Sequence, residues 1–341
     1  MYEIGAILST FGLVASSNGL GHARRLSNLA LGFHSLGYSV NLFISAQQLL
    51  KIRSEFKFPT HSIKIFIIDS HGIDGPVWQK NGFKYVEPNM EIITEISKCD
   101  IIISDNVIWP IKYNENFYLF GHFSWIDYWE NQKSVVFTKR VMKIYENECL
   151  LMNKIKKWFL TKDFQLNVEA RQNISIIPVK LLRYFNDSLI PDKYYPEPTI
   201  WISYGTTKLQ DPAINYKNLM PYFNVKFLET FQLTTSNFKP NLVIGRPGLG
   251  TIRDCLAAGV YFYSVSSGDD LELRSNRESL SKFSKNDLNE LTFDRFTEKL
   301  IMHVHSLDGF LSWDYAWSDI SQNYVEVCES ILRNLIPTSK I

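Results

Sequence analysis

The stretch SSNGLGHARR at residues 16–25 decides which fold the N-terminal half is expected to adopt. It follows the mostly apolar run Ile4–Ala15, whose core is predicted to be a buried parallel strand. Beyond it, apolar residues spaced three and four apart over Ala23–Leu36 predict a helix that ends at Gly37. Ser39–Ser45 predicts the next strand, which completes a strand–helix–strand unit.

The same alternation continues and predicts a doubly wound α/β fold. The later elements expected are strands at Ile63–Asp69, Ile101–Ser104, Asn116–Phe120, Thr199–Ser203, Val225–Glu229, Asn241–Gly245 and Val260–Val265, a turn at Gly205–Thr207, and helices at Glu87–Lys98, near 212–221, and at Gly250–Ala258 and Tyr315–Leu335. Four prolines between residues 178 and 198 mark a boundary. We therefore expect two domains, 1–185 and 186–341, with the last helix packing back on the first domain.

The composition excludes several classes of protein. The 341 residues are 45% hydrophobic and 21% charged, and the formal net charge is +1, so no nucleic-acid partner is expected. The widely spaced cysteines form no CxxC pair, which argues against a zinc ribbon and favours a reducing cytoplasm; they are Cys99, Cys149, Cys255 and Cys328. Neither a secretory signal nor a membrane span is expected, because no basic n-region and no long uncharged apolar run is present.

The first candidate site is the loop Asn18-Gly19-Leu20-Gly21-His22, directly after the first strand. Glycines let backbone N–H groups approach a ligand, and a helix N-terminus attracts a phosphate or an oxyanion. The alternative for His22 is an ordinary residue at the start of a helix, packed or hydrogen-bonded locally.

The second candidate site is Arg246-Pro-Gly-Leu-Gly-Thr251, which opens a helix and places Asp254 in its expected first turn. Gly248 and Gly250 free the backbone, Thr251 can donate to phosphate oxygens, and a carboxylate one turn later can accept from both hydroxyls of a ribose. The alternative is that Asp254 only complements the helix dipole.

Three further groups are weaker candidates. The acidic run after Val260–Val265 offers Asp270, Glu272 and Asn276 to sugar hydroxyls, or is a solvated acidic loop. Asp105 could orient His22 as a general base, or could cap its strand through an Asx turn. His122 and Trp125 in GHFSWIDYW could face an acceptor, although a dense aromatic run is more often core. The histidines show no metal-binding spacing, so no metal is expected.

Taken together, these stretches resemble nucleotide-sugar glycosyltransferases of the GT-B fold. SSNGLGHARRLSNLALGFHSLGYSV is similar to the glycine-rich first loop of that superfamily, which contains a Gly-His pair. PNLVIGRPGLGTIRDCLAAGVYFYSV followed by DDLELRSN resembles its C-terminal donor signature. The nearest similarities are to the peptidoglycan N-acetylglucosaminyltransferase group and to the glycosyltransferase-like half of plant arabinokinases, whose NFSW resembles HFSW here.

The resemblance implies two Rossmann-like domains facing across a cleft, the first on the acceptor side and the second binding the nucleotide sugar. It implies inverting, metal-independent transfer of a hexosyl or N-acetylhexosaminyl group, with a UDP-sugar favoured as co-substrate and no other cofactor. His22 would be the base, oriented by Asp105. The donor would be held by Arg246, Gly248, Gly250, Thr251, Asp254, Asp270, Glu272 and Asn276.

Other functions remain open for the same constellation of residues. A nucleotide-sugar hydrolase would use water in the acceptor's place, an epimerase would need more carboxylates on the N-terminal side, and a binding module would keep the fold without catalysis. The acceptor could be a glycan, a lipid-linked molecule or a small molecule. The basic and aromatic stretch near Lys139–Lys157 could touch a membrane peripherally, or be an ordinary amphipathic helix.

Overall fold

The chain forms two compact units in the computed structural model, which describes residues 9–131, 137–165, 173–203, 216–228, 231, 233–265, 270–285 and 287–335. The first unit runs to Tyr184 and resumes at Gln322. The second unit spans Phe185–Ser321.

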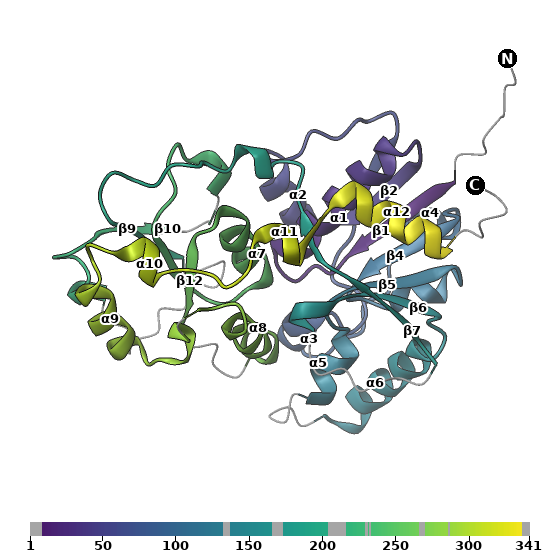
Figure 1. Ribbon diagram of the computed structural model, residues 1–341. Coiled ribbons are helices and arrows are strands. Elements are labelled where there is room, and N and C mark those ends of the chain that lie inside the picture. Colours follow the sequence, from purple (N-terminus) through teal and green to yellow (C-terminus); the bar gives the residue numbers. More distant parts are fainter. Residues whose placement is uncertain are drawn as a thin grey trace, which may run out of the picture. The chain divides into compact units, whose positions relative to one another are not determined.

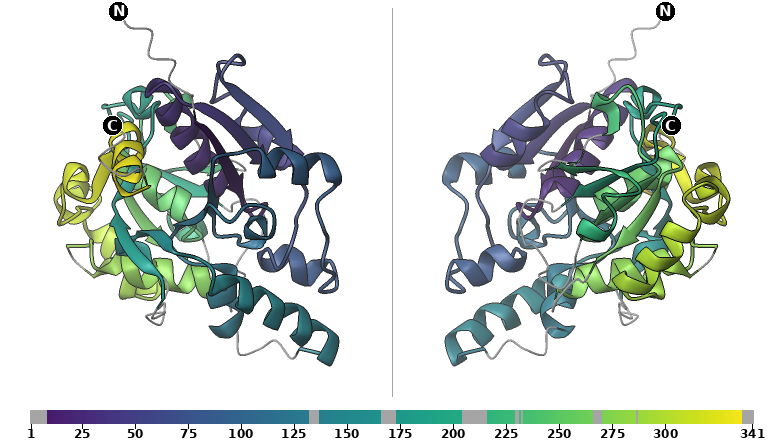
Figure 2. Two further views of the ribbon diagram at one scale, coloured as in Figure 1. Left: turned by 90° about the vertical axis from the view of Figure 1, so that its right-hand side faces the viewer. Right: turned by 90° about the vertical axis from the view of Figure 1, so that its left-hand side faces the viewer.

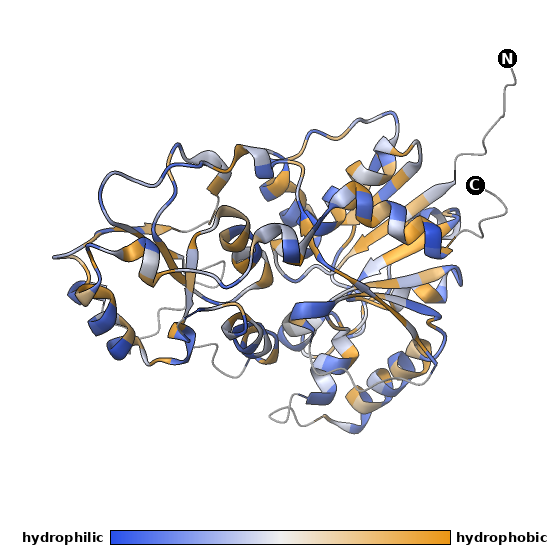
Figure 3. Cartoon of the chain, in the orientation of Figure 1, coloured by the Kyte–Doolittle hydropathy of each residue, from blue (hydrophilic) through white to orange (hydrophobic). Residues whose placement is uncertain are grey.

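A seven-stranded sheet in the order β3-β2-β1-β4-β5-β6-β7 forms the centre of the first unit, and all its neighbouring strands are parallel (Figure 1). Its strands are β1 (Thr10–Ala15), β2 (Ser39–Ile44), β3 (Ile63–Ile67), β4 (Ile101–Asp105), β5 (Phe117–Gly121), β6 (Lys157–Thr161) and β7 (Ser175–Val179). Strand β4 is buried along its whole length, and β1 along all but its first residue. Both strands therefore have both faces covered, which explains their continuous apolar sequences (Figure 3).

Helix α1 packs its apolar face against this sheet. Leu26, Leu29 and Phe33 are fully buried, and the Phe33 ring stacks on Phe11 of β1 with their centroids 4.2 Å apart. The helices of this unit are α1 (Leu20–Ser35), α2 (Ala46–Ile52), α3 (Gly75–Lys80), α4 (Met90–Ser97), α5 (Trp125–Asn131), α6 (Lys139–Met152) and α12 (Tyr324–Leu335), with 3-10 turns η1 (Trp109–Lys112) and η2 (Lys162–Phe164).

The C-terminal helix α12 lies against α1, although Gly32 of α1 and its contact Cys328 of α12 lie about 300 residues apart in the sequence. Figures 1 and 2 show the yellow α12 beside the purple α1. The contact is close because Gly32 has no side chain: a Cβ there would stand 2.6 Å from Sγ of Cys328. The Cys328 thiol also donates to the carbonyl oxygen of Leu29, at 3.4 Å.

The single helix expected at Tyr315–Leu335 is wrong, because the segment divides into three elements. Helix α11 (Trp317–Ile320) ends, β13 (Ser321–Asn323) pairs with β8 (Leu181–Arg183), and α12 then begins. A local signal restarts the helix: the Asn323 side chain accepts from the N–H of Val325, and Glu326 accepts from the N–H of Asn323. This reciprocal capping competes with a continuous helix.

The second unit is a smaller parallel α/β layer. Its sheet has the order β10-β9-β11-β12, formed by β9 (Thr199–Ser203), β10 (Asn224–Leu228), β11 (Leu242–Gly245) and β12 (Tyr261–Ser264). Its helices are α7 (Leu249–Ala258), α8 (Leu271–Ser281), α9 (Phe293–Met302), α10 (Leu307–Phe310) and α11, with 3-10 turns η3 (Asp187–Leu189), η5 (Tyr216–Asn218), η6 (Leu233–Thr235) and η7 (Leu288–Glu290). Tyr263 stacks on Phe296 of α9, which helps to close the core.

The region around the boundary between the two units differs from the expected elements at strand β7. The prolines at 178–198 hid strand β7, which contains Pro178 and lies at the edge of its sheet, where a missing N–H is tolerated. The turn at Gly205–Thr207 and the start of the helix near 212–221 lie outside the described residues. The described part of that helix, residues 216–221, forms the 3-10 turn η5 and turns after it.

Replacing Gly32 by Ala tests the packing of α12 on α1. The added Cβ collides with Cys328 Sγ, so we expect Gly32→Ala to lower the free energy of unfolding by about 1–3 kcal/mol, despite the better helix propensity of Ala. Denaturant unfolding measures this. The double variant with Cys328→Ala should recover part of the loss, because the Cβ still lies 3.2 Å from the Tyr324 carbonyl oxygen, and Gly309→Ala, which meets no atom within 4 Å, should lose little. Equal stabilities for Gly32→Ala and Gly309→Ala would contradict the packing.

Candidate active site

The first candidate site lies at the carboxyl ends of β1 and β4. Strand β1 is followed by the glycine loop and α1, and its neighbour β4 ends in Asp105. The chain leaves β1 toward β2 on one side and later returns to add β4 on the other, so this is a switch point of the sheet. Ligands of open α/β sheets bind at such points.

The structure brings His22 and Asp105 together within the first unit. Nδ1 of His22 lies 3.1 Å from Oδ1 of Asp105, and the exposed fractions of the two residues are 4% and 0%. Arg25, three residues along α1, donates to both carboxylate oxygens of Asp105 at 2.9 Å. Its Nη2 also lies 2.9 Å from Nδ1 of His22. Arg25 was not among the predicted site residues, although its i+3 spacing from His22 places both on one helix face.

The carboxylate of Asp105 is the fixed charge of this cluster. Burial alone would raise its pKa, but the Arg25 guanidinium and His22 outweigh burial and hold the pKa well below its usual range. The Asn106 amide, turned so that its nitrogen donates, reaches Oδ1 of Asp105 at 3.1 Å and the Phe123 carbonyl at 2.7 Å. Gly121, at φ 115°, leaves the room for this, because a Cβ there would stand 2.8 Å from Oδ1 of Asp105.

The glycine loop is held from behind by side chains of other segments. Asp74 accepts from the hydroxyl of Ser16 at 2.5 Å, and from the N–H and hydroxyl of Ser17, both at 2.7 Å. The amide of Gln48 donates to the carbonyls of Ser16 at 2.7 Å and Gly19 at 2.6 Å. Burial raises the pKa of Asp74, and the hydrogen bonds from Ser16 and Ser17 oppose that rise.

The loop leads into an uncapped helix. Gly19 has φ 80°, which favours glycine, and α1 begins at Leu20 without a side-chain cap and without an acidic residue in its first turn. Gly19 is exposed, while Asn18 and Gly21 are partly exposed. The first N–H groups of a helix have no partner within the helix, so this end is suited to an anion or a carbonyl oxygen.

The two aromatic-run candidates are core residues in this structure. Trp125 is 2% exposed and His122 is 1% exposed, so both rings are buried, although Trp125 also lines the small pocket beside the glycine loop. A contact of either residue with an acceptor stays a prediction. Trp125 donates from Nε1 to Oγ of Ser16 at 3.1 Å and thereby supports the glycine loop. His122 packs edge-on against Phe123, with the ring centroids 4.7 Å apart.

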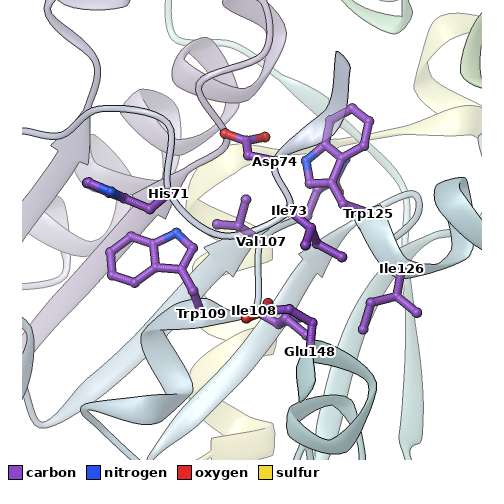
Figure 4. A pocket seen from close by; sticks show the side chains of 10 residues that line it. His71, Ile73, Asp74, Val107, Ile108, Trp109, Trp125, Ile126 and Glu148 are labelled. Carbon is purple, nitrogen blue, oxygen red and sulfur yellow. The ribbon is translucent and has the colours of Figure 1, made fainter. Parts of the chain in front are cut away.

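A small pocket beside the glycine loop was not foreseen. Figure 4 shows its lining residues, which are His71, Ile73, Asp74, Asn106, Val107, Ile108, Trp109, Trp125, Ile126 and Glu148. The pocket has a volume of about 10 Å³, which is room for about one water molecule or one small polar group. The residues come from four separate segments, so no sequence motif marks them.

Besides Asp74, two further titratable side chains of the pocket have shifted pKa values. Burial raises the pKa of Glu148, although Lys112, whose Nζ is 3.4 Å from Oε1, opposes this. Burial lowers the pKa of His71, whose Nδ1 donates to the carbonyl oxygen of Val86 at 3.2 Å. Burial thus disfavours the charged forms of the pocket's carboxyl groups and imidazole, and the same burial suits a neutral polar group better than an ion.

The second candidate site follows β11 in the other unit. Gly248 is the N-cap residue of α7, and the helix has neither a side-chain cap nor an acidic residue in its first turn. A Cβ on Gly248 would meet no atom within 4 Å, and Gly250 and Thr251 are partly exposed. Arg246 precedes this helix end and is also partly exposed. The residues present are those that hold phosphate groups in proteins.

Asn276 supports this loop from below. It is fully buried, and its amide donates to the carbonyl of Pro247 at 3.0 Å, so in this structure it braces the loop and does not reach the surface. Asp270 is the N-cap of α8 and accepts from the N–H of Leu273 at 3.2 Å; burial first, and then Glu272, raise its pKa. Glu272 lies in the first turn of α8 and is partly exposed, and Asp269 lies outside the described residues.

Asp254 lies one turn later than expected. Helix α7 begins at Leu249, so Asp254 belongs to the second turn, and the first-turn placement was wrong. Its Oδ1 accepts from Nη1 of Arg253 at 2.7 Å. The same guanidinium pairs with Asp187 and lies over the Trp317 ring, 5.4 Å from its centroid. Asp254 remains partly exposed, so a ribose would have to share it with Arg253.

Comparison with known proteins shows the fold. No protein-family model and no curated protein matches the sequence. Among solved structures, Arabidopsis thaliana UGT89C1 complexed with UDP-L-rhamnose is 10% identical over 96% of this chain and 99% of its own, with a TM-score of 0.60. Glycosyltransferase VinC in complex with dTDP is 11% identical over 96% and 99%, with a TM-score of 0.55. MurG of Acinetobacter baumannii is 12% identical over 95% and 99%, with a TM-score of 0.50.

These likenesses confirm the predicted fold: the chain has the GT-B fold, with two Rossmann-like α/β units. Within the described part of the chain, no helix has both the length and the apolar character required to cross a bilayer. The same residues contain no group of three or more His, Cys, Asp and Glu side chains placed to hold a metal ion.

Replacing Asp105 by Asn tests the buried charge cluster. The change leaves the Arg25 guanidinium without its counter-charge, so we expect the free energy of unfolding at pH 7 to fall by about 3–5 kcal/mol. Because the pKa of Asp105 is lowered by folding, the stabilisation is present above the unfolded-state value of about 4 and is lost as pH falls toward the folded-state value.

Urea unfolding between pH 7 and pH 3 measures both effects. The difference between wild type and Asp105→Asn should shrink as the pH falls. The control is Glu95→Gln, which breaks the exposed pair with Lys98 and should change stability by less than about 1 kcal/mol. A pH-independent difference for Asp105→Asn would contradict the account.

Proposed function

We propose that the protein is a glycosyltransferase that moves a sugar from a nucleoside diphosphate sugar to an acceptor hydroxyl, with inversion and without a metal ion. The observation that carries the proposal is the buried His22–Asp105 contact at the switch point of a GT-B fold. A general-base imidazole is oriented by a second group, and Asp105 would orient this one when Nδ1–H of His22 is directed at it.

The donor half of the proposal rests on the N-terminus of α7. Its N–H groups, Thr251 and the neighbouring Arg246 are the groups that would bind the diphosphate and stabilise the negative charge that grows as it leaves. The solved relatives in fold that were crystallised with UDP-L-rhamnose and dTDP support a nucleoside diphosphate sugar as donor. A UDP-sugar is the favoured candidate, with Asp254 toward the ribose and Asp270 and Glu272 toward the sugar.

The acceptor half rests on the first unit. His22 would take the proton of the acceptor hydroxyl as that oxygen attacks the anomeric carbon and the nucleoside diphosphate departs. The carboxyl groups of Asp74 and Glu148 beside the loop favour a neutral, hydroxyl-bearing acceptor over an anionic one. The transferred sugar would be a hexose or an N-acetylhexosamine, and the donor screen described next distinguishes the two.

A thermal-shift screen of UDP-, GDP-, dTDP- and CMP-sugars tests the proposal. Binding to the native state raises the unfolding temperature by mass action, so one nucleotide class should stabilise the protein at millimolar concentration. Incubating that donor with and without hydroxylated acceptors then separates transfer from hydrolysis, since hydrolysis releases free sugar without an acceptor. Stabilisation by none of the donors would contradict the proposal.

Gly248→Ala tests the donor site alone. The new methyl group has space in the free protein and its φ of −69° is unstrained, so we expect an unchanged unfolding temperature. It would intrude on a bound phosphate, and affinity for the nucleoside diphosphate should fall at least about tenfold, or about 1.4 kcal/mol. Calorimetric titration measures this, with Gly309→Ala as the matched control. Undiminished affinity would remove α7 from the donor site.

His22→Gln tests the chemistry. Loss of a general base lowers the turnover number by about 10²–10⁴-fold while the donor still binds. Rates of nucleoside diphosphate release, compared with donor affinity for the same variant, measure the two separately. A variant that binds donor normally and retains the wild-type rate would show that His22 is not the base.

A further inference from the structure

The nitrogen Nδ1 of His22 has two competing neighbours. One is Oδ1 of Asp105 at 3.1 Å, which can only accept a hydrogen bond. The other is Nη2 of Arg25 at 2.9 Å, which can only donate one. A neutral imidazole nitrogen carries either a proton or a lone pair, so these two hydrogen bonds exclude each other, and the choice fixes the tautomer of His22.

The surroundings of Asp105 favour the bond from Arg25. Oδ1 of Asp105 already accepts from Nη2 of Arg25 at 2.9 Å and from the Asn106 amide at 3.1 Å, and Oδ2 accepts from Nε of Arg25. Both oxygens of the Asp105 carboxylate therefore accept hydrogen bonds even when His22 donates none. Nη2 carries two N–H bonds, so it can serve Asp105 with one and Nδ1 of His22 with the other.

We propose that Arg25 is a positioning residue that holds resting His22 with its proton on Nε2, and so restrains the base of the proposed transfer reaction. In this tautomer Nε2 donates a hydrogen bond and cannot accept a proton. The base-competent tautomer has Nδ1–H directed at Asp105, and it forms only when the Arg25 N–H leaves Nδ1. The exchange is balanced: water supplies one proton to Nδ1 and removes one from Nε2.

This inference deepens the proposed function and depends on it for its consequence. A base that is restrained in the resting protein cannot activate a water molecule beside a bound donor, so Arg25 would suppress wasteful hydrolysis. Asp74, behind the glycine loop, also interacts electrostatically with His22, and its carboxylate accepts hydrogen bonds from Ser16 and Ser17.

Long-range ¹H–¹⁵N correlation spectra of protein labelled with ¹⁵N-histidine test the tautomer directly. The spectra are recorded at about pH 8, well above the ordinary imidazole pKa of about 6.5, on the full chain without ligand. His22→Gln identifies the His22 signals among the seven histidines. We expect the wild-type protein to show the proton on Nε2. A proton on Nδ1 in the wild type overturns the proposal without any Arg25 variant, while the base role of His22 in the proposed function stands.

Arg25→Lys tests the cause. A lysine keeps the positive charge beside Asp105 but has one compact ammonium in place of the fixed fork that pairs with both carboxylate oxygens and also reaches Nδ1 of His22, so the proton should move to Nδ1. The matched control is Arg24→Lys: Arg24 is the preceding residue of α1, is equally buried, and pairs with Glu55 at 2.9 and 2.7 Å. It should leave the His22 tautomer unchanged. A proton that stays on Nε2 in Arg25→Lys overturns the assignment to Arg25.

Donor hydrolysis gives the functional readout. Free sugar released from the donor that binds best should increase several-fold in Arg25→Lys over wild type and over Arg24→Lys, and the increase should vanish in the double variant with His22→Gln. If the His22 tautomer changes in Arg25→Lys but the rate of donor hydrolysis does not, the proposal that Arg25 restrains the base is wrong. If no donor binds at all, the proposed function fails, and the spectra still decide the tautomer.

Discussion

A helix that starts without a side-chain cap leaves its first backbone N–H groups without a partner inside the helix. Each unit of this protein has such a helix directly after a central strand of its sheet. Helix α1 follows β1 and α7 follows β11, each through a loop that contains glycine and each without a side-chain cap. Backbone donors left this way need a partner from outside the helix. Other side chains support the loops from behind: Gln48 and Asp74 in the first unit, and Asn276 in the second.

The chemistry of the first unit depends on one buried negative charge. Asp105 is fully buried, and its position determines three neighbours: Arg25 pairs with it, His22 lies against it, and Gly121 must lack a side chain to leave it room. A buried carboxylate without partners would be strongly destabilising, so the cluster is held together by the need to compensate that charge. The same need places the His22 imidazole at a defined position at the carboxyl ends of β1 and β4.

The sequence was sufficient for features that depend on local pattern. The strand–loop–helix passages at β1 and β11 follow from apolar runs, glycines and helical spacing, and so does the GT-B fold that the structural likenesses show. It was insufficient where distant segments decide the outcome. Nothing local shows that Arg253 pairs with Asp187, that Asn276 is buried under Pro247, or that Asp74 reaches the glycine loop.

The edge strand and the C-terminal helix illustrate the same limit. Pro178 resembles a boundary signal until its strand is known to lie at the edge of a sheet, where its missing N–H has no cost. The break before α12 depends on the pairing of β13 with β8, which lies some 140 residues earlier. The trio of His22, Arg25 and Asp105 was partly predicted. The sequence suggested that Asp105, at the end of one strand, orients His22, which follows another, but Arg25 was not predicted because its role depends on the buried carboxylate with which it pairs.

The most direct test of the central claim is calorimetric titration of the protein with UDP, UMP and uridine. If the N-terminus of α7 is an anion site for the diphosphate, affinity should fall steeply from UDP to UMP and again to uridine, with each lost phosphate costing at least about tenfold. Equal affinities for the three compounds, or binding of none of them nor of any other nucleoside diphosphate, would contradict the account.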